Sequence, residues 1–323
     1  MDKVLGLHHI TAISGDAQEN LDFYSGVLGM RLVKRSVNQD DPKTYHLFYA
    51  DAKGNPGTDL TFFPWKDMPR AQPGVGLTSE VQLAVPTGSS EYWQTRLAEQ
   101  GVSTKEETRF GEKSLLFGDP HGMALALVET ADEREFSPWE ASFVPAEYQV
   151  RGLHGARVWE RDLNATETFL LKRLGFEKLA EEKGWHRYGL PSGADGIGGS
   201  GRILDLREVP EGRRGQWGVG GVHHLAWRVR NEEHALAVRE QVDAAGRRPT
   251  DIIDRFWFKS VYFMEPGGVL FELATDGPGF AIDEDADKLG ESLILPPWLE
   301  SSRAQIEAGL PELSMPKKSE ASS

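Results

Sequence analysis

The strongest constraint on the fold is an internal repeat that spans 25 residues. Segments 6–30 (GLHHITAISGDAQENLDFYSGVLGM) and 152–176 (GLHGARVWERDLNATETFLLKRLGF) align without a gap. In both, an apolar strand leads into a turn that contains an aspartate, Asp16 or Asp162, and an amphipathic helix follows that ends at a glycine. A chain that uses one pattern twice at this distance is predicted to be built from repeated units.

A second pair of segments completes the repeating unit. An acidic-Pro-X-Gly turn leads into an apolar strand at 119–129 (DPHGMALALVE) and at 265–275 (EPGGVLFELAT), and a similar turn occurs at 55–64 (NPGTDLTFFP). The unit is therefore predicted to be one strand, one helix and three strands. Four such units are expected, at roughly 5–65, 77–130, 150–209 and 220–276. A period close to 70 residues is too long for a solenoid and favours paired modules.

These units divide the chain at a segment that lacks the repeat pattern. We expect an N-terminal half at 1–130, a linker at 131–149, a C-terminal half at 150–276, and an extension at 277–323. The Ser- and Lys-containing end of the extension is expected to fray.

Composition excludes several classes of function. With 50 acidic and 36 basic residues the net charge is −14, which argues against a partner that is nucleic acid or anionic lipid. No apolar run approaches the length of a membrane span, and the N-terminus lacks the apolar core of a signal peptide, so a cytoplasmic location is expected. The chain has no cysteine, which leaves any metal site to His, Asp and Glu side chains.

Two matching His-His strands point to a metal site. They lie at 6–12 (GLHHITA) and 221–227 (GVHHLAW), and a third apolar strand supplies Glu272. Together the three strands offer His9, His224 and Glu272. Two imidazoles and one carboxylate are the ligand set that leaves open positions on a non-haem Fe(II) ion.

The repeat itself supports this choice. Aligning the turns places Ala126 and Phe62 where the last module has Glu272, and aligning the first strands places Gly155 where the first module has His9. A residue that the fold requires would be present in every module, so these differences indicate a task of one site. A buried glutamate in an apolar strand is also costly unless it is paired or bound to a metal.

Strand alternation leaves open which histidine of each pair faces inward. If Ile10 packs under the helix, His9 and Thr11 face the concave side of the sheet, and the same choice in the last module selects His224. The other members of the pairs then become candidates for contact with the ligands or the substrate; they are His8 and His223.

A weaker rival site lies in the third module. Asp205 could bind a metal together with His154, but that module offers no second histidine on the same strand. The remaining histidines are expected to be structural or exposed: His46, His121, His186 and His234.

Two further residues precede Glu272 on the neighbouring strand and loop. The phenol of Tyr262 could form a hydrogen bond to a substrate oxygen, and Arg255 could hold an anionic oxygen. A half-buried strand tyrosine and a surface arginine are equally compatible with the sequence.

These motifs resemble the vicinal oxygen chelate superfamily, and within it the ring-cleaving dioxygenases that act on hydroquinones. The resemblance covers nearly the whole chain. It rests on LHHIT, 45–64, TRFGEKSLLFGDPHG, VHHLAW, PGGVLFELAT and DEDADKLGESLILPPWLE, which occur in the order that is typical of the family. It implies an α+β fold in which four βαβββ modules pair into two barrel-like halves.

The resemblance also implies the chemistry. It places Fe(II) on His9, His224 and Glu272, with manganese left open as a replacement, and a small aromatic diol and O2 as substrates. It places supporting roles at Thr11, His223, Arg255 and Tyr262, with His223 or Tyr262 as the acid-base group. An imidazole with its ordinary pKa of about 6.5 suits proton transfer near neutral pH. Homo-oligomer formation is left open.

Three alternatives remain at this stage. The same ligands could serve a catechol, whose two adjacent oxygens both reach the metal. Glyoxalase-type isomerisation is less favoured, because that site resembles two histidines with two glutamates and neither Phe62 nor Ala126 supplies the second glutamate. A metal-free binding protein of the same superfamily would not need the His-His-Glu set.

Overall fold

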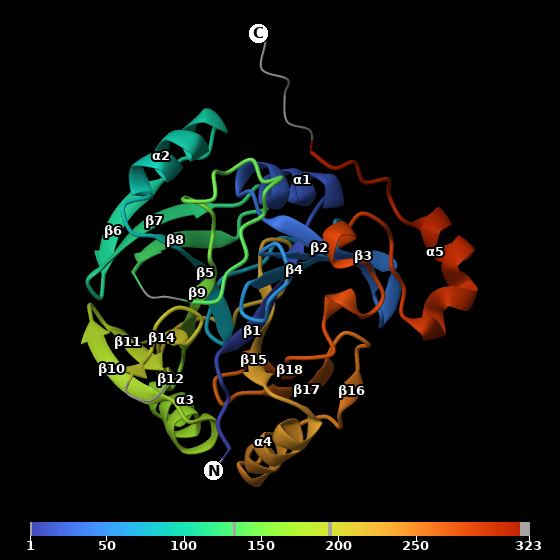
Figure 1. Cartoon of the computed structure of the whole chain (residues 1–323). Coiled ribbons are helices and arrows are strands. Elements are labelled where there is room, and N and C mark those ends of the chain that lie inside the picture. Colours follow the sequence, from blue (N-terminus) through green and yellow to red (C-terminus); the bar gives the residue numbers. More distant parts are fainter. Residues whose placement is uncertain (1, 132–133, 193–195, 317–323) are drawn as a thin grey trace.

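The computed structural model describes residues 2–131, 134–192 and 196–316. Its architecture is α+β, with two curled eight-stranded sheets and the helices packed on their outer faces (Figure 1). Four βαβββ modules build these sheets, so the predicted fold class is confirmed.

The modules have the following elements. The first contains β1 (Leu7–Ser14), α1 (Ala17–Leu21) with a π-helical continuation (Asp22–Val27), β2 (Arg31–Asn38), β3 (Asp41–Ala50) and β4 (Asp59–Pro64). The second contains β5 (Leu77–Pro86), α2 (Ser90–Glu99), β6 (Lys105–Arg109), β7 (Glu112–Gly118) and β8 (Ala124–Thr130). The third contains β9 (Gly152–Glu160), α3 (Leu163–Phe169) with a π-helical continuation (Leu170–Leu174), β10 (Glu177–Glu182), β11 (Trp185–Gly189), the short β12 (Pro191–Ser192) and β13 (Gly196–Ile197), and β14 (Ile203–Glu208). The fourth contains β15 (Val222–Val229), α4 (Glu232–Ala244), β16 (Ile253–Asp254), β17 (Lys259–Met264) and β18 (Leu270–Thr275).

The modules pair across the chain. The first and fourth share one sheet, in the order β16-β17-β18-β15-β1-β4-β3-β2, and the second and third share the other, in the order β10-β11-β14-β9-β5-β8-β7-β6. The segment expected to link two halves, 131–149, therefore separates the second module from the third along the chain but does not separate one sheet from the other. Each sheet combines strands from both sequence halves.

Antiparallel pairing of β1 with β15 joins the first and fourth modules. Ile10 lies opposite Leu225, and both side chains are fully buried in the apolar core. Each such side chain stabilises the fold by about 1.5–3 kcal/mol through removal of apolar surface from water. Burial of Ile10 in the core leaves His9 and Thr11 for the opposite, concave face, as strand alternation requires.

The aspartate turns of the repeat begin the helices. Asp16 accepts hydrogen bonds from the backbone of Gln18 and Glu19, and Asp162 accepts one from Ala165. Each aspartate is thus an N-cap, which satisfies amide groups that have no partner inside the helix. The shared sequence pattern of the two segments therefore has a shared structural basis.

The C-terminal extension packs against the first sheet. It consists of three 3₁₀ segments, Phe280–Ile282, Ala286–Lys288 and Pro297–Ser302, and α5 (Arg303–Gly309). The ammonium of Lys34 on β2 is fully buried and binds the Phe280 carbonyl and the Asp283 carboxylate. The tail that was expected to fray, 317–323, lies outside the described residues. No helix in the described parts of the chain has the length and apolarity needed to span a bilayer.

Candidate functional site

Three strands of the first sheet bring the predicted ligands together. β1 and β15 run antiparallel with Thr11 opposite His224, and β18 runs parallel to β15 with Glu272 beside Ala226. His9 and His224 therefore meet across one strand boundary, and Glu272 meets them across the next. Residues more than 200 positions apart become neighbours because the first and fourth modules share this sheet.

The three donor atoms converge on one point. His9 Nε2 lies 3.1 Å from His224 Nε2 and 3.3 Å from Glu272 Oε2, and His224 Nε2 lies 2.8 Å from Glu272 Oε2. Ligand atoms about 2.1 Å from an ion and at right angles to one another are about 3.0 Å apart. The observed separations fit three adjacent positions on one face of a metal ion. All three side chains are buried. Solvent therefore does not screen the repulsion between the lone pairs of the two imidazole nitrogens and the carboxylate oxygen.

A hydrogen bond behind His9 directs its lone pair to this point. His8 Nε2 lies 3.2 Å from the carbonyl oxygen of Thr275, which can only accept, so Nε2 of His8 carries a hydrogen. Burial, followed by the charge of His9, lowers the pKa of His8 to about 3, so its ring is neutral near pH 7 and its Nδ1 is an acceptor. His9 Nδ1, 2.9 Å away, then donates to it. His9 Nε2 is left unprotonated, as metal ligation requires.

The carboxylate of Glu272 is held in a similar way. Burial alone would raise the pKa of Glu272, but His9 and His224 lower it well below its usual range, so the group is ionised. The hydroxyl of Ser260, from β17, donates to Glu272 Oε1 and leaves Oε2 directed at the two imidazoles. These contacts fit a bound cation, because a buried carboxylate and two unprotonated nitrogens need positive charge between them.

A small, partly enclosed cavity of about 40 Å³ adjoins the ligand atoms. Tyr262 and Arg255 line it together with His9 and His224. The aromatic part of its wall consists of Phe48, Phe63, Trp257 and Phe258. The structure therefore brings two of the predicted supporting residues, Tyr262 and Arg255, to the ligands.

Electrostatics keep both of these residues in their hydrogen-donating forms. Burial, followed by the neighbouring Glu272 carboxylate, raises the pKa of Tyr262, so the phenol keeps its proton. Burial opposes the charge of Arg255, but Tyr262 and Asp40 outweigh it and raise the pKa of the guanidinium. Asp40, in the turn between β2 and β3, accepts from Arg255 at 2.9 and 3.2 Å and fixes it at the cavity edge.

His223 precedes the ligand His224 on β15, and its ring centroid lies 5.7 Å from that of Phe63 in the cavity wall. Its ring stacks on Trp217 with centroids 4.8 Å apart, and it lines a larger open hollow of about 1070 Å³ that also includes Trp65. Its Nδ1 is 2.8 Å from Nδ1 of His224. Burial, followed by His224, lowers the pKa of His223 to about 3, whereas the sequence suggested an ordinary value. The difference arises from loss of water around the ring, and it keeps the His223 ring neutral near pH 7.

Thr11 contacts the site indirectly. Its hydroxyl lies 2.8 Å from that of Thr61, which in turn is 2.9 Å from His46 Nε2. By strand register, Thr61 and not Phe62 corresponds to Glu272, because the turn before β4 is one residue shorter. Neither residue is a carboxylate, so the choice of ligand is unchanged.

Sequence reasoning missed two residues of the site. His46 was expected to be structural or exposed, but its side chain lines the cavity. Ser260 was not considered, although it holds Glu272. A signal for His46 was present, because it alternates with the apolar Phe48 on β3, whereas the role of Ser260 depends on the contact between β17 and β18.

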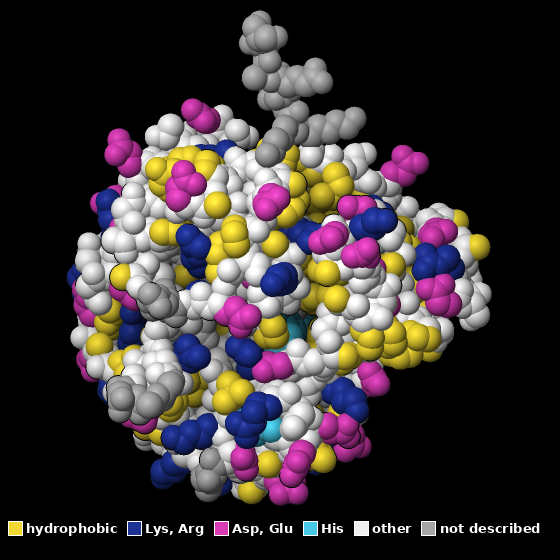
Figure 2. Space-filling model, in the orientation of Figure 1, with side chains coloured by type: hydrophobic (Ala, Val, Ile, Leu, Met, Phe, Trp, Pro, Cys, Tyr) yellow, Lys and Arg dark blue, Asp and Glu magenta, His cyan; other side chains and the backbone are white. Residues whose placement is uncertain are grey.

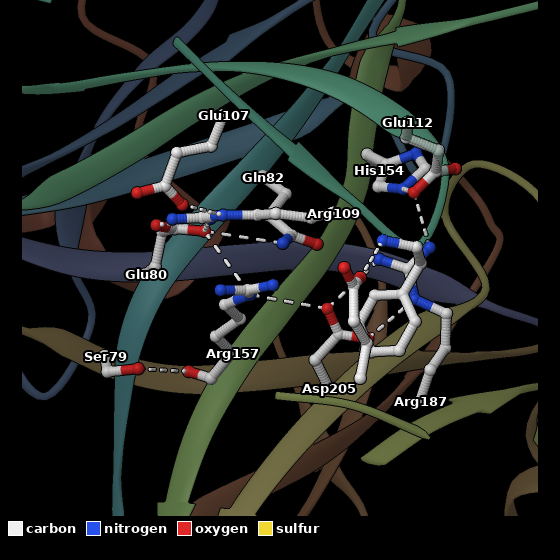
Figure 3. A network of polar contacts seen from close by, with 12 residues as sticks. Ser79, Glu80, Gln82, Glu107, Arg109, Glu112, His154, Arg157, Arg187 and Asp205 are labelled. Atoms are coloured by element: carbon white, nitrogen blue, oxygen red, sulfur yellow. Dashed lines mark hydrogen bonds and ion pairs between the residues drawn. The ribbon is translucent and has the colours of Figure 1, made fainter. Parts of the chain in front are cut away.

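The second sheet holds charged pairs in place of a metal site (Figure 3). By register, Gly155, Glu80 and Ala126 occupy the positions of the three ligands. The fully buried Asp205 accepts from Arg187 at 2.8 Å and from Arg157 at 3.4 Å.

The rival site of the third module is therefore occupied by side-chain pairs. His154 lies near the Glu112 carboxylate and the Ser200 hydroxyl, and Arg187 binds the same Glu112 (Figure 3). Within the described parts of the chain, the three predicted ligands form the one group of three His, Asp or Glu donors within 4.8 Å of one another. Figure 2 shows only small areas of histidine on this face, in keeping with their burial.

Comparison with known proteins identifies the family. The sequence model of the Glyoxalase/Bleomycin resistance protein/Dioxygenase superfamily matches residues 6–127 and 152–273, which contain the four modules. The chain belongs to this superfamily. The predicted relationship is thereby confirmed.

Individual members of the superfamily match over almost the full length. The chain is 43% identical over 312 residues to a Bacillus subtilis protein named "Putative ring-cleaving dioxygenase MhqE", and the match covers 96% of this chain and 100% of that one. It is 34% identical over 317 residues to the "Chlorohydroquinone/hydroquinone 1,2-dioxygenase" of Sphingobium indicum, with 94% and 95% covered.

Solved structures agree with this placement. A Bacillus subtilis structure described as a "putative dioxygenase" superposes with a TM-score of 0.92 at 39% identity and covers 98% of this chain and 100% of that one. Glyoxalase I of Zea mays superposes with a TM-score of 0.63 at 17% identity, with 84% and 92% covered, and shares the fold.

Proposed function

We propose that this protein is an Fe(II)-dependent dioxygenase that uses O2 to open the ring of a hydroquinone-type aromatic diol. The observation that carries the proposal is the convergence of His9 Nε2, His224 Nε2 and Glu272 Oε2 in a buried cavity. Full-length similarity to proteins named as ring-cleaving and hydroquinone dioxygenases supports it. Mn(II) suits the same donors, so the choice of iron is part of the proposal. Cytoplasmic location and self-association stay predictions of the sequence.

The bound metal would supply redox chemistry and open positions for a diol oxygen and for O2. The protonated phenol of Tyr262 donates a hydrogen bond to the diol oxygen and keeps it oriented. The guanidinium of Arg255 stabilises the negative charge that develops on that oxygen. Both groups stand ready in the required protonation state before the substrate arrives.

His223 is proposed to accept a hydrogen bond from the incoming diol. Its ring is neutral near pH 7, and it lies between the open hollow and the ligand His224. Its Nε2 has no hydrogen-bond partner among the described residues, so the neutral ring can accept a hydrogen bond from an incoming hydroxyl. His8 orients His9, and Thr11 holds Thr61, whose hydroxyl contacts His46; these are the roles we propose for the two remaining predicted residues.

The cavity wall excludes water and must also admit the ring. Phe48, Phe63, Trp257 and Phe258 leave about 40 Å³. A cavity that holds benzene is on the order of 150 Å³, so entry of a diol requires side chains to move. The pair of Asp40 with Arg255 is the polar contact at this edge of the cavity, and we propose that it opens on entry.

Oxygen uptake tests the proposal. The protein is loaded with Fe(II) without oxygen and then offered 2-methylhydroquinone, chlorohydroquinone and catechol in parallel. We expect one O2 consumed for each hydroquinone lost, because both oxygen atoms enter the opened ring. Oxygen uptake with catechol alone would show that the substrate is a vicinal diol and not a para-diol. If none of the three diols supports oxygen uptake, the reaction class is refuted.

Two variants serve as controls. Glu272→Gln removes the ligand charge in the same volume and should abolish metal binding and oxygen uptake while the fold is kept, as checked by circular dichroism. Tyr262→Phe should retain the metal and lower kcat. Full activity of Glu272→Gln would exclude the assigned ligand set.

A further inference from the structure

An additional imidazole, which none of the roles above uses, faces the metal cavity. His46 lies on β3 and lines the same cavity as His9 and His224. Its ring is packed between Phe48, at 3.9 Å between centroids, and Phe63, at 4.4 Å. Two aromatic neighbours hold the ring plane in one orientation, so its nitrogens have fixed directions.

His46 is connected to the ligand strand by a short chain of hydrogen bonds. Nε2 lies 2.9 Å from the Thr61 hydroxyl, which lies 2.8 Å from the Thr11 hydroxyl on β1. Thr11 is directly opposite His224. The chain fixes the position of His46 relative to the metal ligands without placing it among them.

The other nitrogen of the ring is free for a ligand. Nδ1 of His46 has no hydrogen-bond partner among the described residues. Burial, followed by His9 and His224, lowers the pKa of His46 well below its ordinary range, so the ring is neutral and offers one donor and one acceptor. A polar atom of this kind in a largely apolar, partly enclosed cavity gains stability when a substrate hydroxyl binds to it.

The spacing of the strands suits a ring between His46 and the ligands. In the first sheet β3 is separated from β1 by β4. Two steps between neighbouring strands span about 10 Å, enough for one aromatic ring with a hydroxyl at each end. The oxygens of a para-diol lie on opposite sides of the ring, whereas those of an ortho-diol are adjacent and both turn toward one metal.

We propose that His46 hydrogen-bonds the distal hydroxyl of the diol, the one remote from His9, His224 and Glu272, and thereby selects para-diols over ortho-diols. The proposal rests on the proposed function and names the residue that determines its substrate class. It assigns His46 contact with substrate and assigns Thr61 the positioning of His46.

The test compares two diols in two variants. His46→Phe keeps the ring contacts with Phe48 and Phe63 but removes the polar atoms, and His46→Gln retains a donor and an acceptor. Dissociation constants of 2-methylhydroquinone and 4-methylcatechol are measured without oxygen by quenching of tryptophan fluorescence on Fe(II)-loaded protein, together with kcat and KM in oxygen. His186→Phe, the same change on β11 of the other sheet, is the control.

We expect His46→Phe to weaken binding of the hydroquinone about tenfold and to raise its KM by a similar factor, with the catechol changed less than about twofold. His46→Gln should recover part of the loss, and the metal content should stay equal to that of the parent. An equal loss of affinity for both diols, or no loss for either, would overturn the proposal. A purely structural role of His46 would not change the ratio of the two dissociation constants. If the parent protein binds a diol but takes up no oxygen, the dioxygenase is refuted, and the ratio of the two dissociation constants still tests His46. No binding of either diol by the parent would refute both.

Discussion

Ser260 provides a sharp test of how the metal site is held. Its hydroxyl is fully buried and donates to Oε1 of Glu272, which is also fully buried, while Oε2 faces the two histidines. Replacement by alanine removes this donor and adds no bulk. The carboxylate then loses the contact that sets its rotation, and Oε2 spends less time at the ligand position.

The expected size of the effect follows from the burial of both partners. A hydrogen bond to a charged group contributes about 1.5–3 kcal/mol, and each 1.4 kcal/mol corresponds to about a factor of ten in affinity. The same bond stabilises the carboxylate without metal, so only the loss of alignment lowers affinity. We therefore expect Ser260→Ala to weaken metal binding by about 10–100-fold, the range found when a group behind a ligand is removed.

The assay is anaerobic competition for Fe(II) against a chelator of known affinity. Ser36→Ala is the matched control, because Ser36 is also fully buried in the first sheet and its hydroxyl has no hydrogen-bond partner among the described residues. The control should bind metal as the parent does. An unchanged affinity in Ser260→Ala, with the fold intact, would show that Glu272 needs no support and would refute the reasoning.

Three further predictions concern other parts of the chain. Burial and the neighbouring Glu265 raise the pKa of Glu160, so the folded chain holds a proton that the unfolded chain releases above about pH 4.5. The free energy of unfolding should therefore fall with rising pH, by up to about 1.4 kcal/mol per pH unit. Urea unfolding at about pH 5.5 and about pH 8 measures this slope, and Glu160→Gln should remove it. Asp40→Asn should lower KM for the diol roughly threefold with metal affinity unchanged, because it weakens the ion pair that must open on entry, and an unchanged KM would remove this pair from substrate entry. Asp205→Asn should lower the free energy of unfolding by about 3 kcal/mol, since it removes the buried carboxylate that two buried guanidinium groups share, yet keep one metal per chain. Loss of the metal in that variant would revive the rival site.

Much of the candidate site could be predicted because its residue types are unusual for their surroundings. His9, His224 and Glu272 interrupt apolar strands, and the repeat shows that the fold itself does not need them. Tyr262 lies opposite Glu272 on the adjacent strand, so a hairpin suffices to predict the contact. The position of His223 was harder to predict, because its surroundings depend on Trp217 and on the open hollow that both residues line.

The residues that sequence reasoning missed depend on contacts that no local pattern encodes. His46 occupies a strand position that alternation allows for either a core or a cavity side chain. It faces the metal cavity because β3 joins the same curled sheet as β1 and β15. Ser260 is an ordinary strand serine until the pairing of β17 with β18 brings it to Glu272.

The sequence by itself determined the modules, their capped helices and the ligand types, because these follow from periodicity and turn chemistry within short stretches of chain. Only the tertiary structure decided that the first module pairs with the fourth and the second with the third. Strand edges of the modules are chemically alike, and the choice between them depends on how whole apolar faces pack. That choice places two histidines 215 positions apart on one metal site, and it leaves Gly155, Glu80 and Ala126 at the matching positions of the other sheet.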